Sequence, residues 1–253
     1  MPSYAPASRA EFHLSLQGPF ELSQGAVPIV LPGASQRLLA FLALHDRTSK
    51  RSAIAGTLWP EASEANAHGS LRSAIARLKA LSRGVIEVDF LNVRLATTVS
   101  LDIRDSRALA HRLLLIDTIP ADADTIPQAV AALSSDLLPL WYDEWVLLKA
   151  EDWRQLRLHA LEVLSARLAH AERFGDATAA ARAAIQADPL RESAHAALFR
   201  VFLAEGNQSE ALRAYENYRS LLREELGLEP TIRLSQLVRE TRDTSRDNLI
   251  RTG

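Results

Sequence analysis

The stretch Asn66-Ala-His-Gly-Ser-Leu-Arg-Ser-Ala-Ile-Ala-Arg-Leu-Lys-Ala-Leu-Ser-Arg83 has the residue pattern of one amphipathic helix. Its apolar side chains recur at spacings of three and four residues, at Leu71, Ala74, Ile75, Leu78 and Leu81. Residues at this spacing lie on one stripe of a helix, and a stripe of this kind is expected to be buried. The sequence therefore predicts a helix over residues 66–83 that packs against a core.

The opposite face of this helix carries the cations. At about 100° per residue, the residues that point away from the core are Gly69, Arg72, Ser73, Ala76, Ala80 and Arg83, with His68, Arg77 and Lys79 on the flanks. Small residues allow close approach to another surface, and guanidinium groups can reach base edges and phosphates. A face that only meets solvent is the alternative interpretation, because most cationic helix faces are solvated.

The distribution of charge favours contact with an anionic polymer. The whole chain has a net charge of −2, and no acidic residue lies between Glu64 and Glu87. Residues 1–104 contain 11 basic and 8 acidic residues, a net charge of +3, whereas residues 105–253 contain 18 and 23, a net charge of −5. Only the first part of the chain is therefore suited to nucleic acid.

Length and composition indicate a soluble protein with two domains. The 253 residues are 47% hydrophobic and 24% charged, which is typical of globular proteins. There is no apolar run long enough to span a membrane, no secretory signal at the start and no cysteine, so we expect a cytoplasmic protein.

The residues around the cationic helix predict a helix-turn-helix domain with a wing. Short strands are expected over 12–16, 20–22 and 27–31 as a small antiparallel sheet, followed by helices over 35–45 and 52–59. Pro60 ends the second of these helices, because it has no amide hydrogen to donate. Residues 84–96 alternate as a hairpin, which would form the wing, and a strand over 99–103 is expected to pair with that hairpin.

The second part of the chain is predicted to be helical throughout. Helices are expected over 106–115, 127–138 and about 143–173, with a loop over 120–124. A shift of 34 residues superposes Leu161, Leu164, Leu168, Ala177, Ala181 and Ala184 on His195, Leu198, Phe202, Ala211, Tyr215 and Tyr218. This period is typical of tetratricopeptide repeats. The last repeat helix should continue to Leu226, where Gly227 caps it.

These motifs together resemble the SARP-type activators, a family of actinobacterial transcription factors. The motifs that carry the resemblance are residues 35–45, Leu58-Trp-Pro-Glu-Ala62, residues 71–79, Asp188-Pro-Leu-Arg-Glu-Ser193 and Glu225-Leu-Gly-Leu-Glu-Pro230. The resemblance implies a mainly α chain with an OmpR-like winged helix-turn-helix domain (α+β) and an all-α, tetratricopeptide-like bacterial transcriptional activation domain. The expected division is a disordered segment 1–10, domains 11–104 and 105–240, and a frayed tail 241–253.

The resemblance also implies the function and the partners. Helix 66–83 would enter the major groove of promoter direct repeats, and the wing near residues 88–94 would approach the minor groove or the backbone. The output would be recruitment of RNA polymerase through its sigma factor or alpha subunit, with the helical domain serving dimerisation or regulation. Larger members carry an ATPase module, but this sequence contains no Gly-x-x-x-x-Gly-Lys-[Ser/Thr] motif.

The candidate DNA-binding residues fall into three groups. Arg72 and Ser73 are expected to meet base edges, since they lie on the outward face one turn into the helix. Arg77 could contact DNA or pair with Glu61 or Glu64, and His68 and Lys79 flank the same face. Phosphate contacts are expected at Lys50, Arg51, Arg83 and Arg94. Lys50 and Arg51 stand where the family commonly has a Ser-Arg-Glu cap, and a nearby phosphate would offset cations at a helix N-terminus.

The other conspicuous residues are interpreted as structural. Trp59 is expected to be a core residue. The cluster Trp141, Trp145 and Trp153 is expected to pack between helices, with an exposed aromatic patch for a partner as the less favoured interpretation. The histidines have no metal-ligand spacing and no catalytic motif occurs, so we expect no enzyme activity, no metal and no cofactor. The competing functional hypothesis is a tetratricopeptide protein-interaction scaffold, or a signal-sensing adaptor, that does not read DNA.

Overall fold

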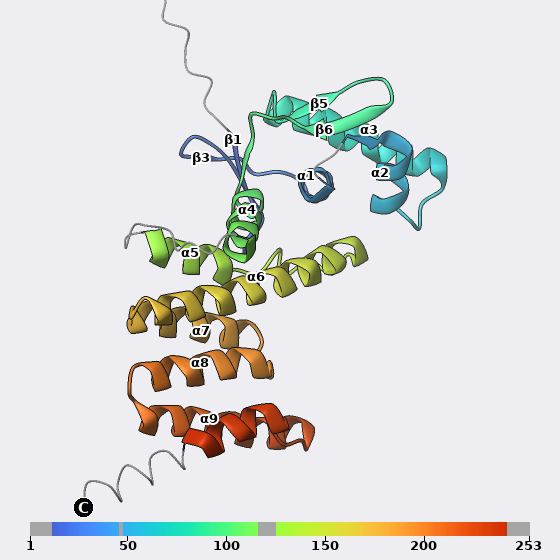
Figure 1. Cartoon of the computed structure of the whole chain (residues 1–253). Coiled ribbons are helices and arrows are strands. Elements are labelled where there is room, and N and C mark those ends of the chain that lie inside the picture. Colours follow the sequence, from blue (N-terminus) through green and yellow to red (C-terminus); the bar gives the residue numbers. More distant parts are fainter. Residues whose placement is uncertain (1–11, 46–47, 116–124, 242–253) are drawn as a thin grey trace, which may run out of the picture. The chain divides into compact units, whose positions relative to one another are not determined.

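Figure 1 shows the computed structural model of the chain, which describes residues 12–45, 48–115 and 125–241. Most of these residues are helical, and every strand among them lies before residue 102, so the mainly α class is confirmed. The chain divides into two compact units. The first unit comprises the residues up to Asp105 together with Asp136–Trp153, and the second comprises Ser106–Ser135 and the residues from Arg154 onward. The predicted segment 1–10, the loop 120–124 and the tail beyond Thr241 lie outside the described residues.

The first unit begins with a four-stranded sheet in the order β3-β2-β1-β7. Its strands are β1 (Phe12–Ser15), β2 (Glu21–Gln24), β3 (Val27–Pro28) and β7 (Ser100–Leu101). The first three are antiparallel, as predicted, but β7 pairs in parallel with β1 and not with the hairpin. The predicted partner of this strand was therefore wrong.

Asp102 gives the physical reason for the position of β7. Its carboxylate accepts hydrogen bonds from the backbone amides of Leu16 and Gln17, at 2.9 Å to each, and from the hydroxyl of Ser15. A carboxylate that accepts several hydrogen bonds binds strongly, and here it fixes the chain after β7 beside the end of β1. A contact between residues 86 positions apart in sequence leaves no local signal, so the strand pattern alone could not reveal it.

The hairpin is present and belongs to a second sheet. Strands β5 (Ile86–Val88) and β6 (Asn92–Leu95) pair antiparallel, with Glu87 opposite Arg94. A two-residue strand that was not predicted, β4 (Ser49–Lys50), pairs with the other edge of β6 and gives the order β4-β6-β5. The hairpin is thereby joined to the residues that precede the second helix.

Three helices form the centre of the first unit: α1 (Gly33–His45), α2 (Arg51–Leu58) and α3 (Glu64–Leu81). Residues 38–44 of α1 are all buried, which confirms its predicted central position. The predicted stripe of α3 is buried at Leu71, Ala74, Ile75 and Leu78, but Leu81 is 51% exposed. The helix ends at Leu81 because Ser82 leaves the helical conformation, so Arg83 lies beyond the helix and not on its outward face.

Residues 136–153 pack with the first unit and not with the helices that surround them in sequence. The amide of Gly18 donates to Asp136 and the amide of Leu138 donates to Leu16, at 2.8 and 2.9 Å. The predicted helix 127–138 therefore ends early, as α5 (Thr125–Ser134), and the chain turns toward β1. The division expected near residue 104 stays a prediction about domains, since these compact units follow contacts in space.

Two tryptophans of this segment, Trp141 and Trp145, are half-buried and pack against aromatic rings, of which only Phe41 belongs to a helix. Trp141 stacks on Phe20 with ring centroids 5.9 Å apart, and Trp145 meets the edge of Phe41 at 5.4 Å. Trp153 is 1% exposed. The segment is further held by an ion pair of 2.5 Å between Arg37 and Asp143.

The second unit is built from consecutive helices. These are α4 (Asp102–Leu115), α5, α6 (Glu144–His170), α7 (Phe174–Ala187), α8 (Glu192–Ala204) and α9 (Gln208–Leu226), where α4 and α6 begin in the first unit. Figure 1 shows α7, α8 and α9 stacked in layers. Of the positions related by the 34-residue shift, His195 and Tyr215 are half-buried and the others are buried. The tetratricopeptide assignment stays a prediction.

The last repeat helix ends where the sequence predicted. Gly227 has a left-handed conformation with φ 67°, and its amide donates to the carbonyl of Arg223 at 3.0 Å. Residues 232–241 form a further helix, and Leu234 and Val238 of this helix are buried. Within the described parts of the chain, no helix is both long enough and apolar enough to cross a membrane.

His195 makes the stability of the second unit depend on pH. Its ring stacks on Tyr218 at 4.1 Å and its Nε2 hydrogen bonds to the carbonyl of Pro189. Burial lowers the pKa of His195 below its ordinary value of 6.5, although the hydrogen bond and the nearby Asp188 and Glu192 oppose this shift. Below pH 6.5 the unfolded chain therefore binds more protons than the folded chain. The free energy of unfolding decreases as the pH is lowered.

We expect the urea midpoint of the second unit to fall as the pH is lowered from neutral to about 5.5. His195→Gln should flatten this dependence, because it removes the group that titrates differently in the two states. His159→Gln is the control, since His159 is exposed. Equal pH slopes in His195→Gln and the unmodified chain would rule out this role for His195.

Candidate nucleic-acid interface

The outward face of α3 has the composition that the sequence predicted. Arg72, Ser73, Ala76, Arg77, Lys79 and Ala80 are exposed, while Gly69 and His68 are half-buried. The face therefore combines small residues with three cations whose side chains reach solvent. It is formed because the apolar stripe of the same helix is held against the core.

The cations on and just after α3 form no salt bridge with an acid of the described residues, apart from the contact of His68 with Glu64. Within the described residues, no carboxylate forms a salt bridge with Arg72, Arg77, Lys79 or Arg83. The alternative pairing of Arg77 with Glu61 or Glu64 is not seen, and Glu64 instead lies 4.0 Å from His68. Uncompensated cations on one face produce a positive potential that attracts polyanions.

The N-terminal half of α3 borders a depression of about 570 Å³. Its lining includes Trp59, Asn66, Gly69, Arg72 and Arg77. Trp59 was expected to be a core residue, but it is half-buried and forms one wall. A Cβ added at Gly69 would lie 3.8 Å from the guanidinium of Arg72, an ordinary van der Waals contact.

The N-terminus of α2 brings two further cations near the hairpin. Lys50 is the N-cap of α2 and makes no side-chain capping bond, and Arg51 is the first helical residue. The amide of Arg51 donates to the carbonyl of Leu91 at 2.9 Å, and Lys50 pairs with Asn92 in the sheet. Lys50 is exposed and Arg51 half-buried, so the predicted phosphate contacts lie beside the hairpin tip.

Asp89 gives the hairpin tip a defined shape. Its carboxylate accepts hydrogen bonds from the side chain of Asn92 at 3.2 Å and from the amides of Leu91 and Asn92 at 2.8 and 2.7 Å. These bonds hold the pKa of Asp89 below its ordinary value of 3.8. The turn displays Phe90, which is 89% exposed, and Leu91, which is 62% exposed. The sequence interpretation did not single out these two residues.

Among the described residues, Arg94 is the proposed phosphate contact that forms a salt bridge. Its Nε donates to the Glu87 carboxylate at 2.8 Å, across the two strands of the hairpin. The signal was present in the sequence, because a tight hairpin places these residues opposite each other. A phosphate would have to compete with Glu87 for this guanidinium.

The described residues contain no group of three or more His, Cys, Asp and Glu side chains placed to hold a metal ion. The perturbed pKa values that are found belong to a turn, a stacked ring pair and an exposed ion-pair cluster around Glu229. Each of these has a structural cause.

Comparisons with known proteins identify the second part of the chain. Residues 107–242, more than half of the chain, match the family described as bacterial transcriptional activator domain. The chain is 28% identical over 251 residues to regulatory protein AfsR of Streptomyces griseus, which covers 92% of this chain and 24% of that protein. It is 29% identical over 217 residues to AfsR of Streptomyces coelicolor, with coverage of 79% and 21%. The chain thus spans less than a quarter of the length of these relatives.

A solved structure has the same fold. Mycobacterium tuberculosis EmbR, determined in complex with a low-affinity phosphopeptide, matches with a TM-score of 0.69 and 21% sequence identity. The match covers 92% of this chain and 65% of the EmbR chain. At this identity the likeness concerns the fold alone.

Removing the Asp89 carboxylate should loosen the hairpin tip. In Asp89→Ala we expect the amide protons of Leu91 and Asn92 to exchange with solvent faster, as measured by NMR hydrogen exchange. Asp89→Asn keeps one acceptor oxygen and should give intermediate rates. Because the pKa of Asp89 is lowered, the effect should be complete above pH 3.8 and disappear as the pH falls through the folded-state pKa. Unchanged exchange in Asp89→Ala would contradict this account of the turn.

Proposed function

Because the chain belongs to the bacterial transcriptional activator domain family of SARP-type regulators, we propose that it activates transcription by sequence-specific binding to promoter DNA. Its relatives are regulatory proteins, which supports a regulatory and not an enzymatic role. The observation that carries the proposal is the outward face of α3, where cations without acidic partners stand among small residues. Such a face can enter the major groove without an electrostatic penalty.

The residues of this face have different proposed roles. Arg72 and Ser73 meet base edges, since they are exposed on the outward face at the middle of α3. The Ser73 hydroxyl donates to the carbonyl of Gly69 at 3.1 Å, which leaves its oxygen free to accept a bond. Arg77, Lys79 and the half-buried His68 are placed to contact the groove or the adjacent phosphates.

The proposed phosphate contacts lie around α3. Lys50 and Arg51 approach the backbone from the N-terminus of α2, where the cationic side chains and the positive end of the helix dipole favour an anion. Arg83 reaches it from the turn after α3. The hairpin acts as the wing of a winged helix, and Arg94 exchanges Glu87 for a phosphate on binding.

The second unit supplies the regulatory part of the proposal. We assign DNA binding to residues 11–104 and regulation or dimerisation to residues 105–240, which we regard as tetratricopeptide-like. Two protomers would bind direct repeats in the cytoplasm and recruit RNA polymerase through its sigma factor or alpha subunit. The family match and the stacked helices support this division.

One observation favours the alternative, a protein-interaction scaffold that does not read DNA. Phe90 and Leu91 are apolar and exposed at the hairpin tip, where a purely DNA-binding wing would gain more from cations. The composition of the α3 face opposes this alternative, because a protein-binding surface depends on buried apolar or aromatic residues.

Arg72→Ala tests base readout. We expect affinity for a cognate promoter fragment to fall by about 1–3 kcal/mol, with a much smaller loss on random duplex DNA. Electrophoretic mobility shifts on both duplexes measure the difference. Arg213→Ala is the matched control, because Arg213 is an exposed helical arginine of the second unit. An equal loss of affinity on both duplexes would mean that Arg72 contacts phosphates and does not read bases.

The salt dependence of binding tests the number of phosphate contacts. If four to six phosphates are neutralised by each protomer, a plot of log K against log salt should have a slope of roughly −4 to −5. Lys50→Gln should make this slope shallower by about 1, because it removes one phosphate contact. A wild-type slope near zero would contradict DNA binding through this face.

A further inference from the structure

The second unit contains a groove that the proposed DNA contacts do not use. It has a volume of about 550 Å³ and lies between the C-terminal half of α6, the start of α7 and α8. This volume is within the range of about 300–1,000 Å³ that is typical of small-molecule sites. Its apolar lining consists of Ala166, Ala169, Phe174, Ala197, Val201 and Ala204. Four alanines on facing helices leave space that larger side chains would fill.

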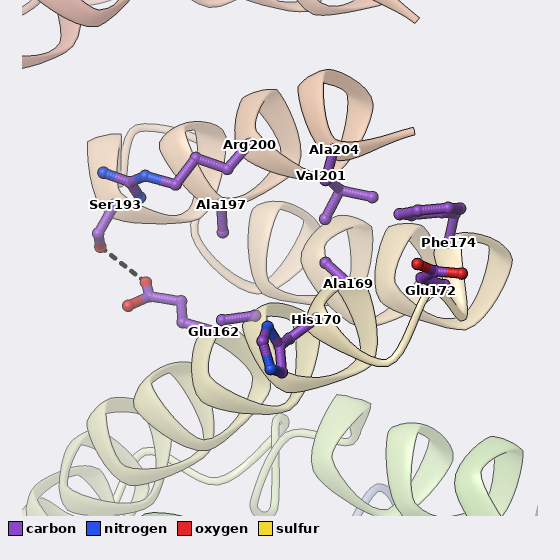
Figure 2. A pocket seen from close by; sticks show the side chains of 11 residues that line it. Glu162, Ala169, His170, Glu172, Phe174, Ser193, Ala197, Arg200, Val201 and Ala204 are labelled. Atoms are coloured by element: carbon purple, nitrogen blue, oxygen red, sulfur yellow. Dashed lines mark hydrogen bonds between the residues drawn. The ribbon is translucent and has the colours of Figure 1, made fainter. Parts of the chain in front are cut away.

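Arg200 stands at one end of the groove. Figure 2 shows its guanidinium beside Ser193, whereas Phe174 and Glu172 lie at the opposite end. Glu162 is the acid of the lining that lies on the side of Arg200 (Figure 2). Its carboxylate accepts hydrogen bonds from Arg191 at 2.6 Å and from the Ser193 hydroxyl at 2.7 Å. No carboxylate of the described residues forms a salt bridge with Arg200.

A second, smaller cavity meets the groove at the same side chains. Its volume is about 260 Å³, and it shares Ser193 and Arg200 with the groove and adds Arg233. Glu192 also lines this cavity, but its carboxylate accepts from the amide of Thr231 at 2.8 Å and from the Thr231 hydroxyl. Arg233 forms no salt bridge with any described residue. Arg200 of α8 therefore borders both cavities, whereas Arg233 of the helix 232–241 lines only the smaller one, and neither forms a salt bridge with a described residue.

We propose that this groove binds a small amphiphilic anion, with its carboxylate or phosphate head at Arg200 and its apolar body against Phe174 and Val201. The unpaired guanidinium of Arg200 is suited to a planar or tetrahedral oxyanion. The Glu172 carboxylate at the far end repels a head group placed there, which sets the direction of the ligand. The site lies within the second unit and does not depend on DNA binding.

The test uses the full chain and three probes with apolar tails of seven or eight carbons: octanoate, octyl phosphate and octanamide. Isothermal titration calorimetry should give saturable binding of one or both anions with a Kd of about 1 mM or tighter. The uncharged octanamide should bind at least about tenfold more weakly, because it cannot use the guanidinium charge. The ratio of octanoate to octyl phosphate then distinguishes a carboxylate from a phosphate ligand.

Two variants locate the binding. Arg200→Gln should weaken binding of the anions about tenfold or more and leave octanamide unchanged. Ala166→Leu places a larger side chain in the groove from an exposed position, so it should weaken all three probes without disturbing the core. Arg213→Gln, on exposed α9 surface, is the control and should bind like the unmodified chain.

The proposal is overturned if neither anion binds saturably, if octanamide binds as well as octanoate, or if Arg200→Gln leaves anion binding unchanged. These outcomes are independent of promoter binding, which is measured separately by the mobility shifts. Loss of promoter binding with retained octanoate binding would refute the DNA-binding proposal alone.

Discussion

The close packing of α3 against α1 is the constraint on which the first unit depends. Ser35 and Ala74 are both fully or almost fully buried at this contact, and the Ser35 hydroxyl lies 3.4 Å from the carbonyl of Ala74. Small side chains allow two helix backbones to approach, and the leucines on either side then fill the core. Once one face of α3 is fixed in this way, its arginines can only point outward. The chemistry of the outward face therefore follows from the burial of the inward face.

In both units, the acids near the proposed binding cations contact other side chains. Glu64 of α3 is 4.0 Å from His68, and Glu162 is bound by Arg191. Arg94 is the exception, because Glu87 lies directly opposite it in the hairpin. An arginine without a partner remains free to bind an external anion, whereas a paired arginine must first lose its acid. The two proposed sites, on α3 and at Arg200, are both places where this competition does not arise.

The segment 136–153 belongs to the first compact unit, although the residues before and after it belong to the second. The two units are therefore not two successive stretches of the chain. The residues of this segment leave the second unit, form hydrogen bonds with Leu16 and Gly18 just after β1, and continue as the first turns of α6. Asp143 and Trp145 hold it against α1 through an ion pair and an aromatic contact. A cut in the chain at residue 105 would therefore separate this segment from its packing partners. Domain boundaries inferred from sequence and compact units in space need not coincide.

The elements with local sequence signals could be predicted without the structure. The apolar period of α3, the stop at Pro60, the hairpin at 86–95 and the glycine cap at Gly227 each depend on a few neighbouring residues. The cationic face of α3 could also be predicted, because helical geometry alone gives the residues that share one face of a helix. The three-dimensional contacts were needed to find the partner of β7, the place of residues 136–153, the pairing of Arg94 and the groove at Arg200. These features depend on contacts between residues distant in sequence, where the hydrogen bonds and ion pairs of Asp102, Glu87 and Glu162 select one arrangement among several that the local pattern allows.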